Sequence, residues 1–272
     1  MTYGIVGGGD RYKSLARLIS KKNDVITLGA DSDSDRNLGA VISRCDVIIL
    51  PIPLKSDVML KGSLLYPDGI RLCDIKNGIA EKQVFGGALS DEIAAAYPFI
   101  HDFSTPMFAY KNAVLTAEGL ICEMIRHRRR SIFMSNILIT GYGRIAKITA
   151  EYLKQMGAFV TIAARRQSAL SEAFCTGFKI MNLSDLNLSG YDYVINTVPH
   201  MIFDKRVLNT ADMTSSPEIF DIASAPGGVD FDRAKTLGIP TYFLPGLPSV
   251  YSPDTAAEYI YDEITNILEK ES

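Results

Sequence analysis

A short glycine-rich segment near the middle of the chain has the residue types that bind the phosphates of a dinucleotide. It follows an apolar run at residues 137–140 and places Gly141, Gly143 and Ala146 at the spacing of a dinucleotide fingerprint. Gly141 permits a tight turn, Gly143 lets a pyrophosphate approach the backbone, and the small Ala146 lets the following helix pack closely on the strand. The phosphates would bind at a helix N-terminus, where free N–H groups and the helix dipole favour negative charge. The expected contacts are Gly141, Tyr142, Gly143, Arg144 and Ile145.

The segments around this turn have the order that a dinucleotide site requires. A helical run to Met156 leads to a second apolar strand within residues 157–164, which ends at Arg165 and Arg166. An NAD site usually has a carboxylate at this tip, whereas a guanidinium pairs well with the 2′-phosphate of NADP. We therefore predict that NADP is favoured over NAD, with contacts from Ala164, Arg165 and Arg166. Two alternatives remain: one arginine stacks on the adenine while the other faces solvent, or the domain binds no cofactor.

Three more polar turns rich in glycine and proline end predicted strands. The first strand runs into its loop within residues 191–199, and the other two strands span residues 218–223 and 241–244. In a doubly wound sheet, ligands bind outside the carboxyl ends of the strands, so we expect these turns to surround the ribose and nicotinamide. The same residues also suit any turn, which makes the individual assignments weaker than the set. The expected contacts are Thr197, Val198, Pro199, Ala223, Ser224, Pro245 and Gly246.

Histidine is the residue type best suited to move a proton near neutral pH. His200 directly follows the predicted nicotinamide loop and is our candidate general base, against the alternative of a loop residue with no catalytic role. His101 and Asp102 form a second candidate pair, but we favour a surface loop there. With three histidines and no CxxC pair among four cysteines, we expect no metal site and reduced, buried thiols.

The N-terminal half repeats the strand–turn–helix pattern with a different turn. Strands are predicted at residues 3–6, 24–29, 45–50, 70–75 and 83–87. A glycine turn at the carboxyl end of a strand can hold a small anion. Candidates for gripping a substrate carboxylate are Gly8, Gly9, Asp10 and Arg11, unless the glycines only turn the chain. A second dinucleotide is disfavoured because bulky Tyr12 takes the third fingerprint position, although Asp31 lies close to the end of the second strand.

A helix predicted to open at Thr116 joins the two halves and ends in the basic run 126–130. Cations at a helix C-terminus favour the dipole, and a net charge of −3 does not indicate nucleic-acid binding. Asn112 and Thr116 would lie near a cleft between domains, where ligands tend to bind, and are candidate substrate contacts.

The predicted fold is α/β, with two doubly wound, Rossmann-like parallel-sheet domains and a cleft between them. Residues 1–115 form a substrate or assembly domain, and residues 116–272 form the NADP-binding domain. The last helix, from about residue 255 to 270, is expected to pack back on the first domain. The chain has 272 residues, of which 47% are hydrophobic, and no apolar run approaches the length of a membrane helix, so we expect a cytoplasmic protein.

The order and spacing of motifs over residues 137–254 resemble the A subunit of dipicolinate synthase. The first half matches more loosely, through residues 7–10 and 112–119, and it differs from the family pattern at Leu115, where a proline is usual. His200 also differs, because a small hydroxyl residue is expected there. The matching blocks are residues 141–144, 163–165, 196–199, 221–231 and 245–248.

This resemblance implies an NADP-dependent dehydrogenase that oxidises a (hydroxy)tetrahydrodipicolinate ring to dipicolinate, in the lysine and diaminopimelate branch that serves sporulation. It implies a small dicarboxylate as substrate and, as partner, the flavoprotein-like B subunit of dipicolinate synthase, in a homo- or hetero-oligomer. Two other functions stay open. One is another NADP-dependent oxidoreductase, of the hydroxy-acid or shikimate dehydrogenase type, which would share the loop at residues 196–199. The other is a non-catalytic subunit that senses NADP.

Overall fold

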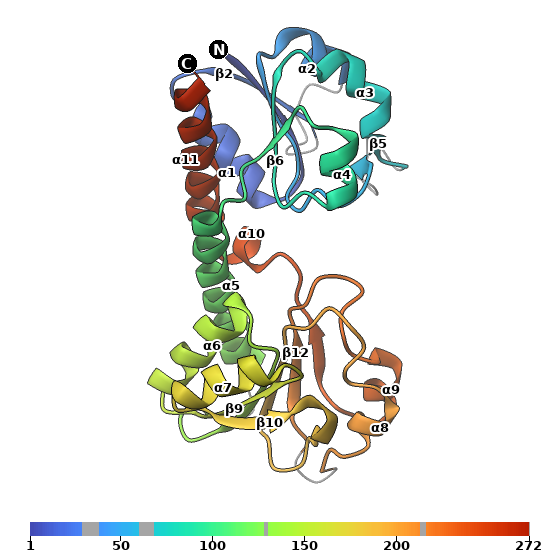
Figure 1. Ribbon diagram of the computed structural model, residues 1–272, viewed down its shortest axis with the longest axis vertical. Helices are drawn as coiled ribbons and strands as arrows, with labels where there is room; N and C mark the ends of the chain where they lie inside the picture. Colours follow the sequence, from blue (N-terminus) through green and yellow to red (C-terminus); the bar gives the residue numbers. More distant parts are fainter. Residues whose placement is uncertain (29–37, 60–67, 128–129, 213–215, 272) are drawn as a thin grey trace. The chain divides into compact units, whose positions relative to one another are not determined.

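The structure is a computed structural model that describes residues 1–28, 38–59, 68–127, 130–212 and 216–271 (Figure 1). The chain forms two compact units. Unit 1 comprises Met1–Asn112 and Pro248–Ser272, and unit 2 comprises Ala113–Leu247. Helix α5 (Pro106–His127) carries the chain from the first unit into the second, and the chain returns to unit 1 within α10 (Leu247–Tyr251). The predicted division at residue 115 falls inside α5.

Unit 1 is built on a parallel sheet with the strand order β2-β1-β3-β6-β7. The order reverses between β1 and β3, which makes these two neighbours the topological switch point of the unit. The strands are β1 (Thr2–Val6), β2 (Asp24–Leu28), β3 (Val47–Ile49), β6 (Gln83–Gly86) and β7 (Ile100–Asp102), and β4 (Val58–Met59) pairs separately with β5 (Ile70–Arg71). The helices are α1 (Asp10–Ile19), α2 (Leu38–Arg44), α3 (Leu72–Ile79), α4 (Asp91–Ala96) and α11 (Pro253–Glu271).

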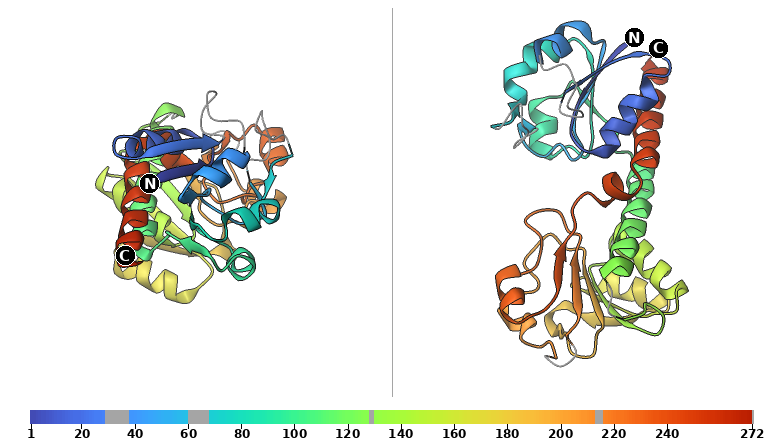
Figure 2. Two further views of the ribbon diagram at one scale, coloured as in Figure 1. Left: turned by 90° about the horizontal axis from the view of Figure 1, so that it is seen from above. Right: turned by 180° about the vertical axis from the view of Figure 1, so that it is seen from behind.

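Both faces of this sheet are buried. Val47 and Ile49 pack in a cluster with residues of α1 and α11, while Ile48 packs in the opposite cluster with residues of α3. Successive side chains of a strand point to opposite faces, so a strand covered on both sides is continuously apolar. Helix α11 lies alongside α1, as Figures 1 and 2 show, and contributes Ile260 and Ile264 to the first cluster.

Unit 2 is built on a six-stranded parallel sheet with the order β10-β9-β8-β11-β12-β13. Its switch point lies between β8 and β11, from which the chain winds outward in both directions. The strands are β8 (Asn136–Thr140), β9 (Phe159–Ala164), β10 (Lys179–Asn182), β11 (Tyr193–Asn196), β12 (Glu218–Asp221) and β13 (Thr241–Phe243). The helices are α6 (Arg144–Gln155), α7 (Gln167–Cys175), η1 (Leu183–Asp185), α8 (Lys205–Leu208) and α9 (Phe231–Thr236). Two parallel sheets with alternating helices confirm the predicted α/β class.

Four local predictions are wrong. The thiols are not all buried, because Cys73 and Cys175 are exposed. Residues 70–75 are not one strand, because α3 begins at Leu72 and buries Leu72, Ile75 and Ile79 at helical spacing. His101 and Asp102 end strand β7 rather than forming a loop. Helix α5 begins at Pro106, not at Thr116; proline suits the first helical position, and the Thr105 hydroxyl accepts a hydrogen bond from the N–H of Phe108 (3.1 Å).

Candidate functional site

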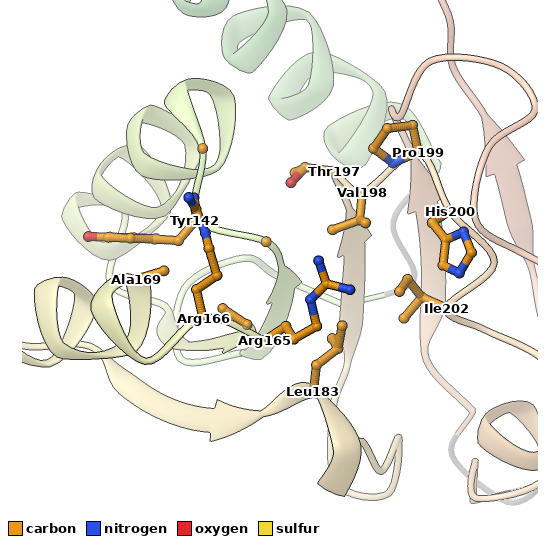
Figure 3. Close-up of a pocket in the computed structure, with 13 residues that line it drawn as sticks. Tyr142, Arg165, Arg166, Ala169, Leu183, Thr197, Val198, Pro199, His200 and Ile202 are labelled. Atoms are coloured by element: carbon orange, nitrogen blue, oxygen red, sulfur yellow. The ribbon is translucent and has the colours of Figure 1, made fainter.

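A cavity of about 670 Å³ opens at the carboxyl ends of β8, β9 and β11 in unit 2 (Figure 3). In Figure 3, Tyr142 and Ala169 lie on one side of it, His200 and Ile202 lie on the other, and the Arg165 side chain lies between them. The lining residues are Gly141, Tyr142, Gly143, Ala164, Arg165, Arg166, Ala169, Leu183, Thr197, Val198, Pro199, His200 and Ile202. The structure therefore brings together most of the predicted cofactor contacts and the predicted base.

The two fingerprint glycines have different environments. Gly141 has φ +85°, a conformation that favours glycine, and a Cβ atom there would lie 2.6 Å from the Thr197 hydroxyl oxygen. Gly143 is extended, with φ −84° and ψ −173°, and a Cβ atom there would meet nothing within 4 Å. Gly141 is therefore needed for the turn itself, whereas the space beside Gly143 is open.

Gly143 is also the N-cap of α6, and its lack of a side chain leaves the helix end without a side-chain cap. The N–H groups of Gly143, Arg144 and Ile145 have no hydrogen-bond partner within the part of the chain that the structure describes. Arg144 and Ile145 line an adjoining hollow of about 470 Å³. Ala146, the third fingerprint residue, lies in the first turn of α6 and is fully buried. A helix end with free N–H groups beside an open backbone suits a phosphate.

Arg165 and Arg166 follow β9 and are exposed. Neither guanidinium has an ion-pair or hydrogen-bond partner among the described residues. The described residues that line the cavity include no Asp or Glu. Both cations are therefore available to a ligand, and a ribose would meet no carboxylate from these lining residues.

A buried amide holds the loop that follows β11. The Asn196 Nδ2 donates to the Val198 carbonyl (3.1 Å), and its Oδ1 accepts from the Val198 N–H (3.1 Å) and the Thr140 hydroxyl (2.7 Å). The Thr197 hydroxyl donates to the Thr140 carbonyl (2.7 Å). Asn196 and Thr140 are both fully buried, so these bonds link the loop directly to the end of the neighbouring strand β8.

The Asp221 carboxylate at the end of β12 extends this network. It accepts hydrogen bonds from Asn196 Nδ2 (2.8 Å) and from the N–H groups of Ala223 (3.1 Å) and Gly228 (2.8 Å). A Cβ atom on Gly228 would lie 2.4 Å from Asn196 Nδ2 and 2.6 Å from the His200 carbonyl oxygen. Asp221 is fully buried, where a carboxylate needs hydrogen-bond donors, and these three donors supply them. Together the bonds position the loops after β11 and β12.

His200 lies at the rim of the cavity with an exposed side chain (Figure 3). Its backbone N–H donates to the Val198 carbonyl (2.8 Å), which closes a tight turn. No described residue donates to or accepts from the imidazole, so no hydrogen bond within the described residues orients it. Its role as a base stays a prediction.

Six predicted cofactor contacts do not line the cavity. Arg144 and Ile145 line the adjoining hollow, and the other four lie elsewhere. Ala223 is buried and donates to Asp221, and Ser224 is exposed in the turn that follows. Pro245 and Gly246 are exposed beyond the end of β13. They lie at the carboxyl ends of the outer strands β12 and β13, one and two strands from β11, and their contacts with a cofactor stay predictions.

Three lining residues were not predicted: Ala169, Leu183 and Ile202. Each is apolar, and apolar side chains commonly form the walls of a ligand cavity. Leu183 directly follows β10, so its place beyond a strand end was a usable signal.

The predicted substrate contacts lie on two elements outside this cavity. Gly8 and Gly9 form the turn after β1, and Asp10 and Arg11 begin α1. Asn112 and Thr116 lie four residues apart, and therefore on one face of α5. Asp31 lies outside the described residues.

The chain resembles known proteins along its whole length. It is 28% identical over 284 residues to the A subunit of dipicolinate synthase of Bacillus subtilis (strain 168), covering 97% of this chain and 94% of that protein. No family model matches. The crystal structure of the dipicolinate synthase A chain from Bacillus subtilis has a TM-score of 0.78 and 26% identity, covering 99% of this chain and 96% of that one. These findings confirm the resemblance that the motifs indicate.

Two further structures share the fold. The A subunit of dipicolinate synthase from Bacillus halodurans has a TM-score of 0.78 and 24% identity, covering 98% of this chain and 97% of that one. The pyruvate reductase of Chlamydomonas reinhardtii has a TM-score of 0.61 and 13% identity, covering 98% of this chain and 95% of that one. Within the described residues, no helix is long and apolar enough to cross a membrane.

Proposed function

We propose that this chain is an NADP-dependent oxidoreductase of the same type as the A subunit of dipicolinate synthase. Its substrate would be a hydroxytetrahydrodipicolinate ring, and its product would be pyridine-2,6-dicarboxylate. The observation that carries the proposal is the similarity to that synthase over 97% of the chain, and the cavity in unit 2 supports it.

The reaction that this function requires is the aromatisation of a partly reduced ring. Loss of water from the hydroxylated ring leaves a dihydropyridine dicarboxylate, and loss of a hydride and a proton then gives the pyridine. The nicotinamide cofactor accepts that hydride when it is bound. The protein has to hold the dicarboxylate, place one ring carbon against the nicotinamide, take up the proton and exclude water.

The residues of unit 2 fit a dinucleotide. The free N–H groups at the start of α6 and the open space beside Gly143 match the pyrophosphate, and the fully buried Ala146 permits close helix packing. The apolar side chains of Ala169 and Leu183 suit an adenine ring. The turn at residues 197–200, held by Asn196, would face the nicotinamide.

The charges of the cavity favour NADP over NAD. Arg165 and Arg166 have no partner among the described residues, and a guanidinium binds a phosphate through two parallel hydrogen bonds. The described residues that line the cavity include no carboxylate to bond a ribose 2′-hydroxyl.

We assign the proton transfer to His200, the histidine in the lining of the cavity. Asn112 and Thr116 would contact the far end of the substrate. A partner of the same type as the B subunit of dipicolinate synthase would complete the enzyme, because the relative is one subunit of a synthase.

The test is a coupled assay. The purified chain, with and without the B subunit, is mixed with NADP and freshly generated hydroxytetrahydrodipicolinate, and absorbance follows both NADPH and the aromatic product. Joint growth of the two signals supports ring oxidation, and dependence on the B subunit supports the partnership. Binding of NADP with neither signal under any pairing would refute the synthase function. A hydroxy-acid or shikimate-type dehydrogenase, or an NADP-sensing protein, would then take its place.

A further inference from the structure

A buried arginine without a counter-ion begins helix α1 in unit 1. Only 8% of Arg11 is exposed, and its guanidinium has no hydrogen bond or ion pair with any described residue. Burial lowers the pKa of Arg11, with the nearby Tyr12 hydroxyl opposing this shift, but an arginine in a protein stays protonated. A buried charge without a partner costs free energy, which a bound anion would offset.

Free backbone donors lie at the same turn. The N–H of Gly7 donates to the Leu28 carbonyl (3.1 Å), and the N–H of Arg11 donates to the Ser249 hydroxyl (3.2 Å). The three N–H groups between them, at residues 8–10, have no partner among the described residues. They precede a helix of ten residues, whose dipole adds to the positive potential.

The turn lies where unit 1 is expected to bind ligands. It follows β1, whose neighbour β3 marks the point at which the strand order reverses. The Tyr12 hydroxyl, which lies near the Arg11 charge, donates to the Leu50 carbonyl (3.3 Å) just beyond β3. The arginine and the free N–H groups therefore belong to the carboxyl edge of the sheet at its switch point.

The shape of the turn limits the ligand to a small anion. In unit 2 the first glycine of the turn, Gly141, has the positive φ, whereas in unit 1 it is Gly9 that has φ +87°. The Tyr12 ring is buried against Gly7, and a Cβ atom on Gly7 would lie 3.0 Å from it. The ring takes the place of the small third residue of a dinucleotide fingerprint, so a pyrophosphate would not find the same cradle.

We propose that the Arg11 guanidinium and the free N–H groups of residues 8–10 form a carboxylate site, which binds one carboxylate of a small dicarboxylate ligand. A single carboxylate matches the one buried cation. The exposed Asp10 side chain, paired with Lys13 at 3.2 Å, adds negative charge at this turn, which disfavours a doubly charged phosphate. The choice of a dicarboxylate rests on the proposed function, whereas the anion site itself does not.

The test measures binding of pyridine-2,6-dicarboxylate to the full chain by calorimetry, with and without NADP. Arg11→Met should weaken this binding about 10- to 100-fold, as expected for the loss of a charge-assisted hydrogen bond, and Arg11→Lys should lose less. NADP affinity should not change. Arg17→Met is the matched control, because Arg17 lies on the same helix but is exposed and paired with Asp254 at 3.4 Å; it should bind the dicarboxylate like the wild type.

Stability gives an independent readout. If Arg11 serves a ligand, Arg11→Met removes a buried unpaired charge, and the unfolding temperature without ligand should be equal to or higher than that of the wild type. A clear fall in that temperature for both Arg11→Met and Arg11→Lys would mark a structural role and overturn the proposal.

Three other outcomes would also overturn it: no measurable binding of the dicarboxylate to the wild type, equal binding by the Arg11 variants, or Arg11-dependent binding of inorganic phosphate instead. Binding that depends on Arg11 without any ring oxidation would leave the site standing while the proposed function fails. Ring oxidation that is unchanged in the Arg11 variants would leave the proposed function standing while the carboxylate site fails.

Discussion

Substitution of the two fingerprint glycines by alanine should separate the residue that builds the turn from the residue that admits the cofactor. Gly143→Ala should leave the cofactor-free protein nearly as stable as the wild type. Its backbone is extended, and the new Cβ atom meets nothing within 4 Å. The lower entropy of the unfolded chain stabilises by about 0.4–1 kcal/mol, which roughly offsets the poorer capping by alanine, so the net change should stay within about 1 kcal/mol.

The same methyl group should weaken NADP binding strongly. It would occupy the space that a pyrophosphate needs in order to reach the N–H groups at the start of α6. The loss of one charge-assisted hydrogen bond, worth about 1.5–3 kcal/mol, corresponds to about a 10- to 100-fold lower affinity.

Gly141→Ala should have the opposite profile, with the damage in stability. An alanine at φ +85° costs about 1–2 kcal/mol. Its Cβ atom would also lie 2.6 Å from the Thr197 hydroxyl oxygen and displace the hydrogen bond to Thr140, worth about 1 kcal/mol. The cofactor-free variant should therefore be destabilised by about 2–3 kcal/mol.

The assay is urea unfolding of the cofactor-free proteins beside NADP titration by calorimetry. If Gly143→Ala binds NADP as tightly as the wild type, the open space beside Gly143 is not where the phosphates lie, and the placement of the cofactor is wrong. An undiminished unfolding midpoint for Gly141→Ala would show that the turn does not require the positive φ.

Three further outcomes can be measured on the same protein. Arg165→Ala should lower NADP affinity about 10- to 100-fold and NAD affinity much less. Equal losses of affinity for the two cofactors would refute a contact between Arg165 and the 2′-phosphate. Asp221→Ala should destabilise by about 2–6 kcal/mol in thermal unfolding, since two buried N–H groups lose their acceptor; an unchanged midpoint would show that water replaces the carboxylate. A hydrogen bond from Tyr97 lowers the pKa of Asp57. The stability this contributes is present above the unfolded pKa of about 4 and is lost as the pH falls through the folded pKa, so Tyr97→Phe should flatten the stability profile below about pH 4; identical profiles would contradict it.

The parts of the site that the sequence predicts are local in the chain. The turn at residues 141–146 and the tip at Arg165 and Arg166 can be recognised because strand, turn, helix and strand follow one another without interruption. The error at residues 70–75 is also local, since a short apolar run has no periodicity that separates a strand from a buried helix. The true start of α5 could have been predicted from Thr105 and Pro106, because a capping residue followed by a proline at the first helical position is typical of a helix N-terminus.

The hydrogen-bond network that holds the loop after β11 could not be predicted in this way. Thr140 and Asn196 are 56 positions apart, and Asn196 and Asp221 are 25 apart. They meet only because β8, β11 and β12 are adjacent in the sheet, with Thr140 paired to Asn196 and Asn196 paired to Asp221 in register. Strand order and register therefore decide the contacts, and a single sequence contains no local signal for either. The sequence pattern predicts a functional loop, and the sheet determines which residues position it.

Each unit has a glycine turn at its switch point, but the residue at the third fingerprint position differs. It is Ala146 in unit 2 and Tyr12 in unit 1. In unit 2 the fully buried Ala146 lets α6 pack closely, and the turn presents open backbone at Gly143 beside two arginines without partners among the described residues. In unit 1 the Tyr12 ring fills the space over Gly7, and the only cation at the turn that is buried without a partner in the described part of the chain is Arg11. A long, highly charged cofactor needs the first arrangement, because several phosphates must be neutralised. A single carboxylate needs only the second. The exchange of alanine for tyrosine at one helix position thus accounts for why a chain with two similar sheets would bind one dinucleotide and one small anion.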